Sequence, residues 1–257
     1  MPATDSRPIY VSGDVHLGAI PKDREGSFVR WLEHAAAVTQ GIILNGDLFD
    51  FWFEYASVIP RGHTRVLGAL AAAVDAGVPV TLVGGNHDWW GGSYFEQEIG
   101  VTFLRDPVLV QLAGRRTFLA HGDGLGRGDL GYRAVRWMLR GRTTRWAFRW
   151  LHPDVGAAVA RLVSKTEDRG PTEDEKRRAR SLEEWAIGRL RADPALEMVV
   201  LGHTHIPVLA EVEPGRWLVN SGDWIAHRSY LSLAPGAPPR VLEWEVSAPG
   251  AGVRPGA

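Results

Sequence analysis

The stretch Ile42-Ile43-Leu44-Asn45-Gly46-Asp47 passes from three apolar residues, two of them β-branched, almost directly into a Gly-Asp pair. A short apolar run with a polar end is typical of a buried strand whose carboxyl end leads into a functional loop. The same arrangement recurs in segments 9–16, 80–88, 118–123, 199–205 and 217–223. Helical patterns separate the early runs, so the sequence predicts a largely parallel sheet covered by helices on both faces.

Two helices are expected between the first three runs. In the first, Ser27 is expected to cap a helix that carries Phe28, Trp31 and Leu32. The second has apolar residues at helical spacing from Val66 and is expected to stop at Gly77.

The pattern changes from Pro107 onward. Two apolar runs within 108–120 flank an Ala-Gly-Arg turn and predict a β-hairpin, so we expect a second layer of mixed or antiparallel strands. Residues from about 129 to 191 contain no convincing strand and are expected to form a helical cap over the site. The tail 247–257, rich in Pro, Gly and Ala, is expected to be disordered, which leaves 1–246 as a single domain.

The composition limits the chemistry. The chain has 257 residues, of which 45% are apolar and 23% charged, and these values are ordinary for a globular protein. Because there is no cysteine, thiol catalysis, cysteine-based zinc sites and disulfides are excluded. No apolar run approaches the roughly 18 residues of a membrane span, and the first residues do not resemble a signal peptide. We therefore expect a cytoplasmic protein.

Positive charge is concentrated in one segment. Residues 127–149 hold seven arginines and one acidic residue, although the whole chain has a net charge of −1. Three tryptophans fall in or just after this segment, and such a basic stretch favours an anionic partner. Arginine abundance also follows from a GC-rich genome, since the chain has only three lysines.

Metal-ligating residues gather after the apolar runs. Seven candidates lie within a few residues of a predicted strand end: Asp14, His16, Asp47, Asn86, His121, His203 and His205. Imidazole and carboxylate suit Mn²⁺, Fe²⁺ or Zn²⁺. Seven ligands are too many for one ion but suit two ions that share a carboxylate, an arrangement that clamps a phosphoryl group for attack by hydroxide. Each motif alone is common in turns and caps, but five such blocks at strand ends are hard to explain by turns.

The five blocks, in this order, resemble the motifs of the calcineurin-like metallophosphoesterases over roughly Ile9 to Asp223. They read Asp-x-His, Gly-Asp, Gly-Asn-His-Asp, His-Gly-Asp and Gly-His-Thr-His. The resemblance implies an α/β fold, a four-layer αββα sandwich of two mixed sheets with a helical cap insertion. It implies that one metal is held by Asp14, His16 and His205 and the other by Asn86, His121 and His203, with Asp47 bridging. It further implies catalytic roles for His87 and Asp88, in which His87 contacts the phosphate and protonates the leaving group. A purely supporting hydrogen bond is the alternative for His87.

Further blocks at 46–52, 121–136 and 202–207 resemble the UDP-2,3-diacylglucosamine diphosphatases of lipid A synthesis. This resemblance implies cleavage of a pyrophosphate to UMP and 2,3-diacylglucosamine 1-phosphate with two divalent ions, Mn²⁺ foremost and Fe²⁺ or Zn²⁺ as alternatives. The implied substrate contacts are Asn86, His87, Asp129, Arg136, Ser164 and His203. A helix N-cap is the competing interpretation for Asp129. The chain departs from the best-known members, which carry Arg in place of His87 and Asn and Lys where Asp168 and Pro171 stand.

Tryptophans beside arginines suit an anionic lipid headgroup, so we expect a nucleotide-linked lipid substrate and peripheral contact with the cytoplasmic face of the inner membrane. The alternative is that the apolar face of 132–151 packs on the protein's own core. A metallophosphatase or phosphodiesterase acting on a soluble phosphoester is the competing function. A protein phosphatase is disfavoured because an Asp-Arg-Gly block is missing, and a non-enzymatic scaffold because all seven ligands are present. Nucleic-acid binding along 127–149 is disfavoured by the negative remainder of the chain, although a nuclease stays open.

Overall fold

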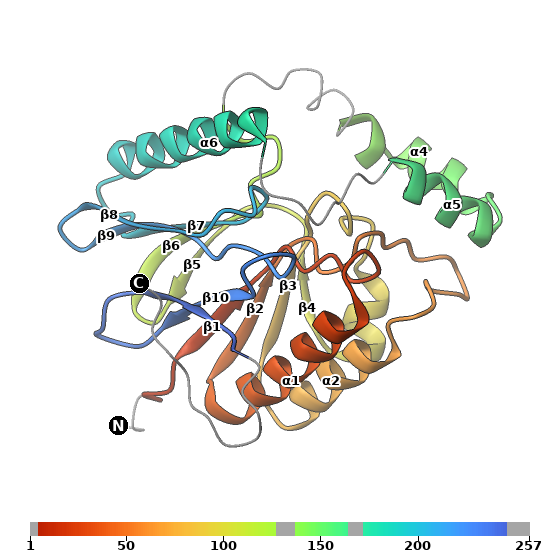
Figure 1. The fold of residues 1–257 in the computed structure, drawn as a ribbon, viewed down its shortest axis with the longest axis horizontal. Coiled ribbons are helices and arrows are strands. Elements are labelled where there is room, and N and C mark those ends of the chain that lie inside the picture. The colour runs from red at the N-terminus through yellow and green to blue at the C-terminus, as the bar shows by residue number, and fades with distance from the viewer. Residues whose placement is uncertain (1–4, 127–136, 164–171, 246–257) are drawn as a thin grey trace.

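The computed structural model describes residues 5–126, 137–163 and 172–245, and the strands among them form two mixed sheets (Figure 1). The first sheet has the order β11 (Arg240–Glu243), β10 (Ser229–Leu233), β1 (Ile9–Ser12), β2 (Gly41–Asn45), β3 (Val80–Val83) and β4 (Thr102–Leu104). Strands β1 to β4 run parallel, and β10 and β11 are antiparallel to their neighbours.

The second sheet has the order β5 (Val108–Leu112), β6 (Arg115–Leu119), β7 (Met198–Leu201), β9 (Arg216–Asn220) and β8 (Val208–Glu213). Its three central strands are parallel, while β5 and β8 pair antiparallel at the edges. The β5–β6 pair is the predicted hairpin, which is thereby confirmed.

The described helices lie outside the sheets. They are α1 (Lys22–Val38), α2 (Thr64–Asp75), α4 (Arg142–Arg149), α5 (Pro153–Val163) and α6 (Glu173–Ala192), with a π-helical turn η1 at Phe95–Ile99. Helices α1 and α2 cover the first sheet, and α6 covers the second (Figure 1). The predicted αββα layering is therefore confirmed.

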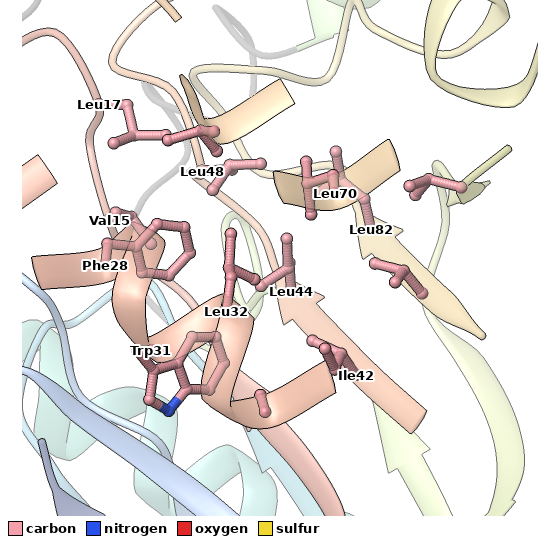
Figure 2. Packing of buried hydrophobic residues seen from close by; sticks show 14 of the residues in the cluster. Val15, Leu17, Phe28, Trp31, Leu32, Ile42, Leu44, Leu48, Leu70 and Leu82 are labelled. Atoms are coloured by element: carbon pink, nitrogen blue, oxygen red, sulfur yellow. The ribbon is translucent and has the colours of Figure 1, made fainter. Parts of the chain in front are cut away.

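Strand alternation builds three cores between these four layers. In β2, Ile42 and Leu44 point to α1 and α2, where they meet Phe28, Trp31 and Leu32 (Figure 2). Ile43 points the other way and packs between the two sheets with residues of β6, β7 and β9. Because successive side chains of a strand face opposite sides, strands buried on both faces appear as continuous apolar runs.

Two sequence expectations about helices change in the structure. Helix α1 begins at Lys22, directly after Pro21, so Ser27 lies inside the helix, fully buried, and the prediction that it is a cap was wrong. A proline directly before the first helical turn fixes the backbone there without removing a helical hydrogen bond. Helix α2 ends as expected, two residues before Gly77, whose φ of +82° only glycine adopts readily.

The predicted insertion at 129–191 divides into two parts in the structure. Helix α6 buries Leu182, Ala186 and Leu190 against the second sheet and is a layer of the fold itself. Helices α4 and α5 instead lie beside the loops at the carboxyl ends of the strands (Figure 1). The expected tail at 247–257 lies outside the described residues.

Candidate metal centre

The loops that follow β1 and β2 run side by side. The backbone amides of Asp14 and His16 donate to the carbonyls of Gly46 and Asp47, each at 3.0 Å, and Leu17 forms a parallel bridge with Phe49. Because parallel strands end at the same edge, the loops after β3, β6 and β7 also arrive there. All seven predicted ligands therefore come from loops at one edge of the stacked sheets.

Most of these ligands have strained backbones. Asp14, His16, Asp47, His203 and His205 have φ between +49° and +69°, in the left-handed region. This conformation costs a residue with a Cβ roughly 1–2 kcal/mol, so it persists only where surrounding contacts impose it. The side chains of these residues lie together in the candidate donor groups, and strained residues of this kind cluster at functional sites.

One group of donors consists of Asp14, His16 and His205. The Nε2 atoms of the two imidazoles lie 3.3 Å apart, and Oδ1 of Asp14 lies 3.4 Å from Nε2 of His205. Oδ1 of Asp14 is buried and accepts no hydrogen bond from the part of the chain that the structure describes. A buried carboxylate oxygen without a donor is expected where a cation completes the site.

A second group consists of Asp47, His121 and His203. Nε2 of His121 lies 3.2 Å from Oδ2 of Asp47 and 3.2 Å from Oδ1 of Asn86. The same Oδ2 of Asp47 lies 3.9 Å from Nε2 of His16 in the first group. Asp47 thus stands between the two groups, where a bridging carboxylate is needed.

Electrostatics divide the buried donors into charged and neutral ones. Burial lowers the pKa of His203 to about 3 and also lowers the pKa of His205, which keeps both rings in the neutral form that binds metals. Burial raises the pKa of Asp14 to about 7. Burial also tends to raise the pKa of Asp47, but the facing imidazoles of His121 and His87 hold it well below its usual range.

Glycines make room for this packing. A Cβ on Gly85 would lie 2.1 Å from Oδ1 of Asp47, and one on Gly46 would lie 2.3 Å from Nδ1 of His121. A Cβ on Gly202 would lie 2.7 Å from Oδ2 of Asp14. The donor set and its close-packed surroundings fit two divalent cations, since imidazole and carboxylate suit Mn²⁺, Fe²⁺ and Zn²⁺.

His87 and Asp88 point in different directions. Nδ1 of His87 donates to the backbone carbonyl of Asp50 at 2.7 Å, and the ring lies edge-on to His16 with centroids 4.7 Å apart. The carboxylate of Asp88 accepts from the amides of Gly85 and Leu48 at 2.8 and 2.7 Å and so ties two loops together. Burial tends to lower the pKa of His87, but Asp47 and Asp50 raise it above its usual value.

Sequence analysis did not identify the carboxylates behind the imidazoles. Asp50 lies behind His16, with Oδ1 3.4 Å from Nδ1, and Asp223 lies behind His205, with Oδ2 3.6 Å from Nδ1. Both follow apolar runs, which is the one signal that the sequence offers. A histidine that binds a metal commonly donates its other ring N–H to such a group.

Helix α4 contacts the loops around the site through aromatic rings. Phe148 packs on Phe53 and Trp90, with centroids 4.6 and 5.0 Å apart. Nearby, Arg140 pairs with Asp123 at 2.8 Å, two residues after His121. The predicted substrate residues Asp129, Arg136 and Ser164 lie outside the described residues.

Within the described residues, none of the helices is both long enough and apolar enough to cross a lipid bilayer.

A buried cluster of imidazoles and carboxylates at the loop edge of an αββα sandwich defines a metal-dependent hydrolase. The family profile described as Calcineurin-like phosphoesterase matches residues 7–207. The chain belongs to this family.

Curated relatives cover most of the chain. A protein of Porphyromonas gingivalis named UDP-2,3-diacylglucosamine hydrolase is 31% identical over 86% of this chain and 92% of its own length. A protein of the same name from Aeromonas hydrophila is 31% identical over 89% of this chain and 95% of its own length. Among solved structures, a dimetal phosphatase from Danio rerio is 12% identical with a TM-score of 0.40 over 93% of this chain and 99% of that chain, a likeness too weak to carry an argument.

Proposed function

We propose that the chain hydrolyses the pyrophosphate of UDP-2,3-diacylglucosamine to UMP and 2,3-diacylglucosamine 1-phosphate, with two divalent cations, Mn²⁺ foremost. The proposal depends above all on the two donor groups joined by Asp47, an arrangement suited to phosphoryl hydrolysis with two metal ions. The substrate comes from the names of the relatives that match the chain over most of its length.

In this proposal, Asp14, His16 and His205 hold one ion, Asn86, His121 and His203 hold the other, and Asp47 is shared. When bound, the ions supply positive charge to the reacting phosphoryl group and activate the attacking water. In the proposal, Asn86 and His203 also contact the phosphate. Asp88 positions the loops, since its carboxylate is occupied by backbone amides.

His87 carries the proton transfer. A carbonyl only accepts hydrogen bonds, so the bond to Asp50 places a proton on Nδ1 and leaves Nε2 available. The protonated ring donates from Nε2 to the bridging oxygen as the P–O bond breaks, and the raised pKa favours this form. The leaving phosphate then departs with that proton.

The outer face of α4 supports peripheral membrane contact. Arg142, Trp146, Arg149 and Trp150 lie on one side of the helix, and the two tryptophans are 65% and 77% exposed. Phe148 occupies the opposite side, toward the protein. Tryptophan beside arginine is the composition that enters an anionic lipid interface. We therefore include contact with an anionic membrane surface in the proposal.

Measuring the release of product tests the proposed substrate. Purified protein with Mn²⁺ is given UDP-2,3-diacylglucosamine, UDP-glucosamine or p-nitrophenyl phosphate, with Asn86→Ala as the inactive control. We expect the acylated substrate to be preferred by orders of magnitude. Equal or faster turnover of the soluble compounds would rule out the lipid substrate and leave the phosphoesterase chemistry standing.

Two further experiments test the finer points. Metal-free protein reconstituted with Mn²⁺, Fe²⁺ or Zn²⁺ should be most active with Mn²⁺. Flotation with phosphatidylglycerol vesicles should fail for Trp146→Ser combined with Trp150→Ser. Leu209→Ser is the matched control, because Leu209 is an exposed apolar residue of β8. Equal flotation of both variants would refute membrane contact through α4.

A further inference from the structure

Strand β5 forms one edge of the second sheet. It pairs with β6 in an unbroken antiparallel register, and β6 is its only neighbour among the strands that the structure describes. Leu109 is 47% exposed, and Gln111 is exposed as well. An open edge offers a row of unpaired backbone groups to another strand, so proteins usually protect it with a short strand, a bulge, a proline or charged side chains.

The other three edges of the described sheets carry such protection. Strand β4 has only three residues. Strand β8 holds Glu211 and Glu213 and has an irregular register between them, and β11 holds Arg240 and Glu243. Strand β5 reads Val-Leu-Val-Gln-Leu and has neither a charge nor a proline. A sequence of this kind at an open edge favours pairing with another strand over exposure to water.

The hairpin turn fixes which backbone groups of β5 face outward. Leu112 and Arg115 flank a two-residue turn and form a hydrogen-bonded pair, and such pairs alternate with non-bonded pairs along the ladder. The backbone groups of Val110 therefore bond to β6, whereas the N–H and C=O groups of Leu109 and Gln111 point to the free edge. Among the described residues, these outward groups have no hydrogen-bond partner.

A second copy of β5 matches this edge. In an antiparallel pairing centred on Val110, Leu109 of each copy lies opposite Gln111 of the other, and each such pair exchanges both of its N–H···O bonds. All the outward groups are then satisfied. Every side chain also stays on its own face of the sheet, because Val108 meets Leu112 and so continues the core between the two sheets.

Charges at the ends of the strand match in the same register. Asp106 is exposed and Arg115 is half-buried, and neither forms an ion pair within the described residues. The pairing brings Asp106 of one copy beside the Ala-Gly turn of the other, directly before Arg115. Arg105 is turned away and donates to the carbonyl of Gly91. Since β5 itself has no charge, no like charges lie opposite one another in the strand pair.

We propose that two copies of the chain pair through β5, in antiparallel register about Val110, and form a dimer with one continuous sheet across its two-fold axis. The interface is isologous, because each copy supplies the same strand. The proposal does not depend on the substrate, since it rests on the edge of the second sheet and not on the donor groups.

Sedimentation velocity tests the dimer, and charged substitutions test its register. The unsubstituted protein should sediment as a dimer at micromolar concentration. Leu109→Lys combined with Gln111→Lys should give a monomer, because like charges directly opposite one another destabilise a strand pair. Leu109→Lys combined with Gln111→Glu places opposite charges at the same positions and should restore the dimer. Both side chains are exposed, so the melting temperature of the isolated monomer should change little.

Leu209→Lys is the matched control. Leu209 is 42% exposed and lies on β8, the opposite edge of the same sheet, so this variant should remain a dimer. Hydrogen exchange gives an independent measurement. The amides of Leu109 and Gln111 should exchange slowly in the dimer and rapidly in the double-lysine variant, because only the second copy protects them.

A monomeric unsubstituted protein would overturn the proposal. A dimer that persists in the double-lysine variant, or that the lysine–glutamate variant fails to restore, would overturn it equally. Should the double-lysine variant not fold, hydrogen exchange of the unsubstituted protein on dilution decides. Slow exchange of Leu109 and Gln111 in a monomer would mean that another segment of the chain covers β5, and it would also overturn the proposal.

Discussion

Replacing Gly85 by alanine tests whether the site depends on the close approach of backbone to Asp47. The added Cβ would lie 2.1 Å from Oδ1 and 2.5 Å from the backbone nitrogen of Asp47, whereas ordinary contact begins at 3.4 Å. Oδ1 must therefore move by about 1.3 Å. Gly85 is not among the glycines with positive φ, so the effect is steric rather than conformational.

A displacement of about 1 Å in a reacting constellation costs on the order of 100-fold in rate. Asp47 is shared by both donor groups, so Gly85→Ala should lower kcat by about 100-fold or more and weaken the binding of both ions. The assay combines kcat on the preferred substrate with metal content after gel filtration. Gly188→Ala is the control, because a Cβ there meets nothing within 4 Å and alanine in a helix is favourable by roughly 0.5–1 kcal/mol. Two bound ions and unchanged kcat in Gly85→Ala would refute this account of the site.

Further predictions concern proton transfer, metal dependence, packing and pH. His87→Gln should lower kcat by about 10²- to 10⁴-fold with unchanged metal content, because the proton donor is lost while the metal ligands stay. If the purified variant has instead lost metal, His87 is a metal ligand. Removing metal with a chelator should abolish turnover and lower the melting temperature, and scanning calorimetry with and without Mn²⁺ would show no shift if the donor groups bind nothing. Leu190→Ala should lower the free energy of unfolding, measured with urea, by about 2–5 kcal/mol, because α6 is a layer of the fold. A change in KM alone would instead indicate that α6 serves to bind the substrate. Burial lowers the pKa of His63 below its ordinary 6.5, so the unfolded chain takes up a proton before the folded one as the pH falls through 6.5, and the free energy of unfolding decreases. His63→Phe should make this decrease smaller, as measured by urea titrations on both sides of pH 6.5. An unchanged dependence of the free energy of unfolding on pH would contradict the prediction.

The sequence predicted the layers well because central strands such as β2 and β7 are buried on both faces. Continuous apolar runs such as Ile42-Ile43-Leu44 are typical of strands covered on both faces, and the polar residues that follow them then lie at a sheet edge. The hairpin at 108–120 was equally local, since its turn residues and alternating strands are adjacent in the chain. All seven predicted ligands lie at that edge for the same reason.

Other expectations depended on contacts that the sequence does not display. Ser27 is a residue type that often caps helices, but it is buried in the middle of α1, because the helix starts at the turn set by Pro21. Helix α6 is highly charged overall and could be read as a cap, yet its few apolar residues fall on one side and pack on the second sheet. For α6, burial against a sheet distant in the sequence outweighed the local pattern.

The sequence by itself therefore determined the donor chemistry and the edge where it gathers, because residue type and strand periodicity are local properties of the chain. Only the tertiary structure decided which atoms face one another: that Asp47 lies between both donor groups, that Asp88 binds amides, and that Asp50 contacts the imidazoles of His16 and His87. These pairings join loops far apart in sequence, as in the 2.9 Å hydrogen bond from the amide of His203 to Asp14, 189 positions away. Such distances are closed only when the two sheets stack, so no local pattern could have specified them.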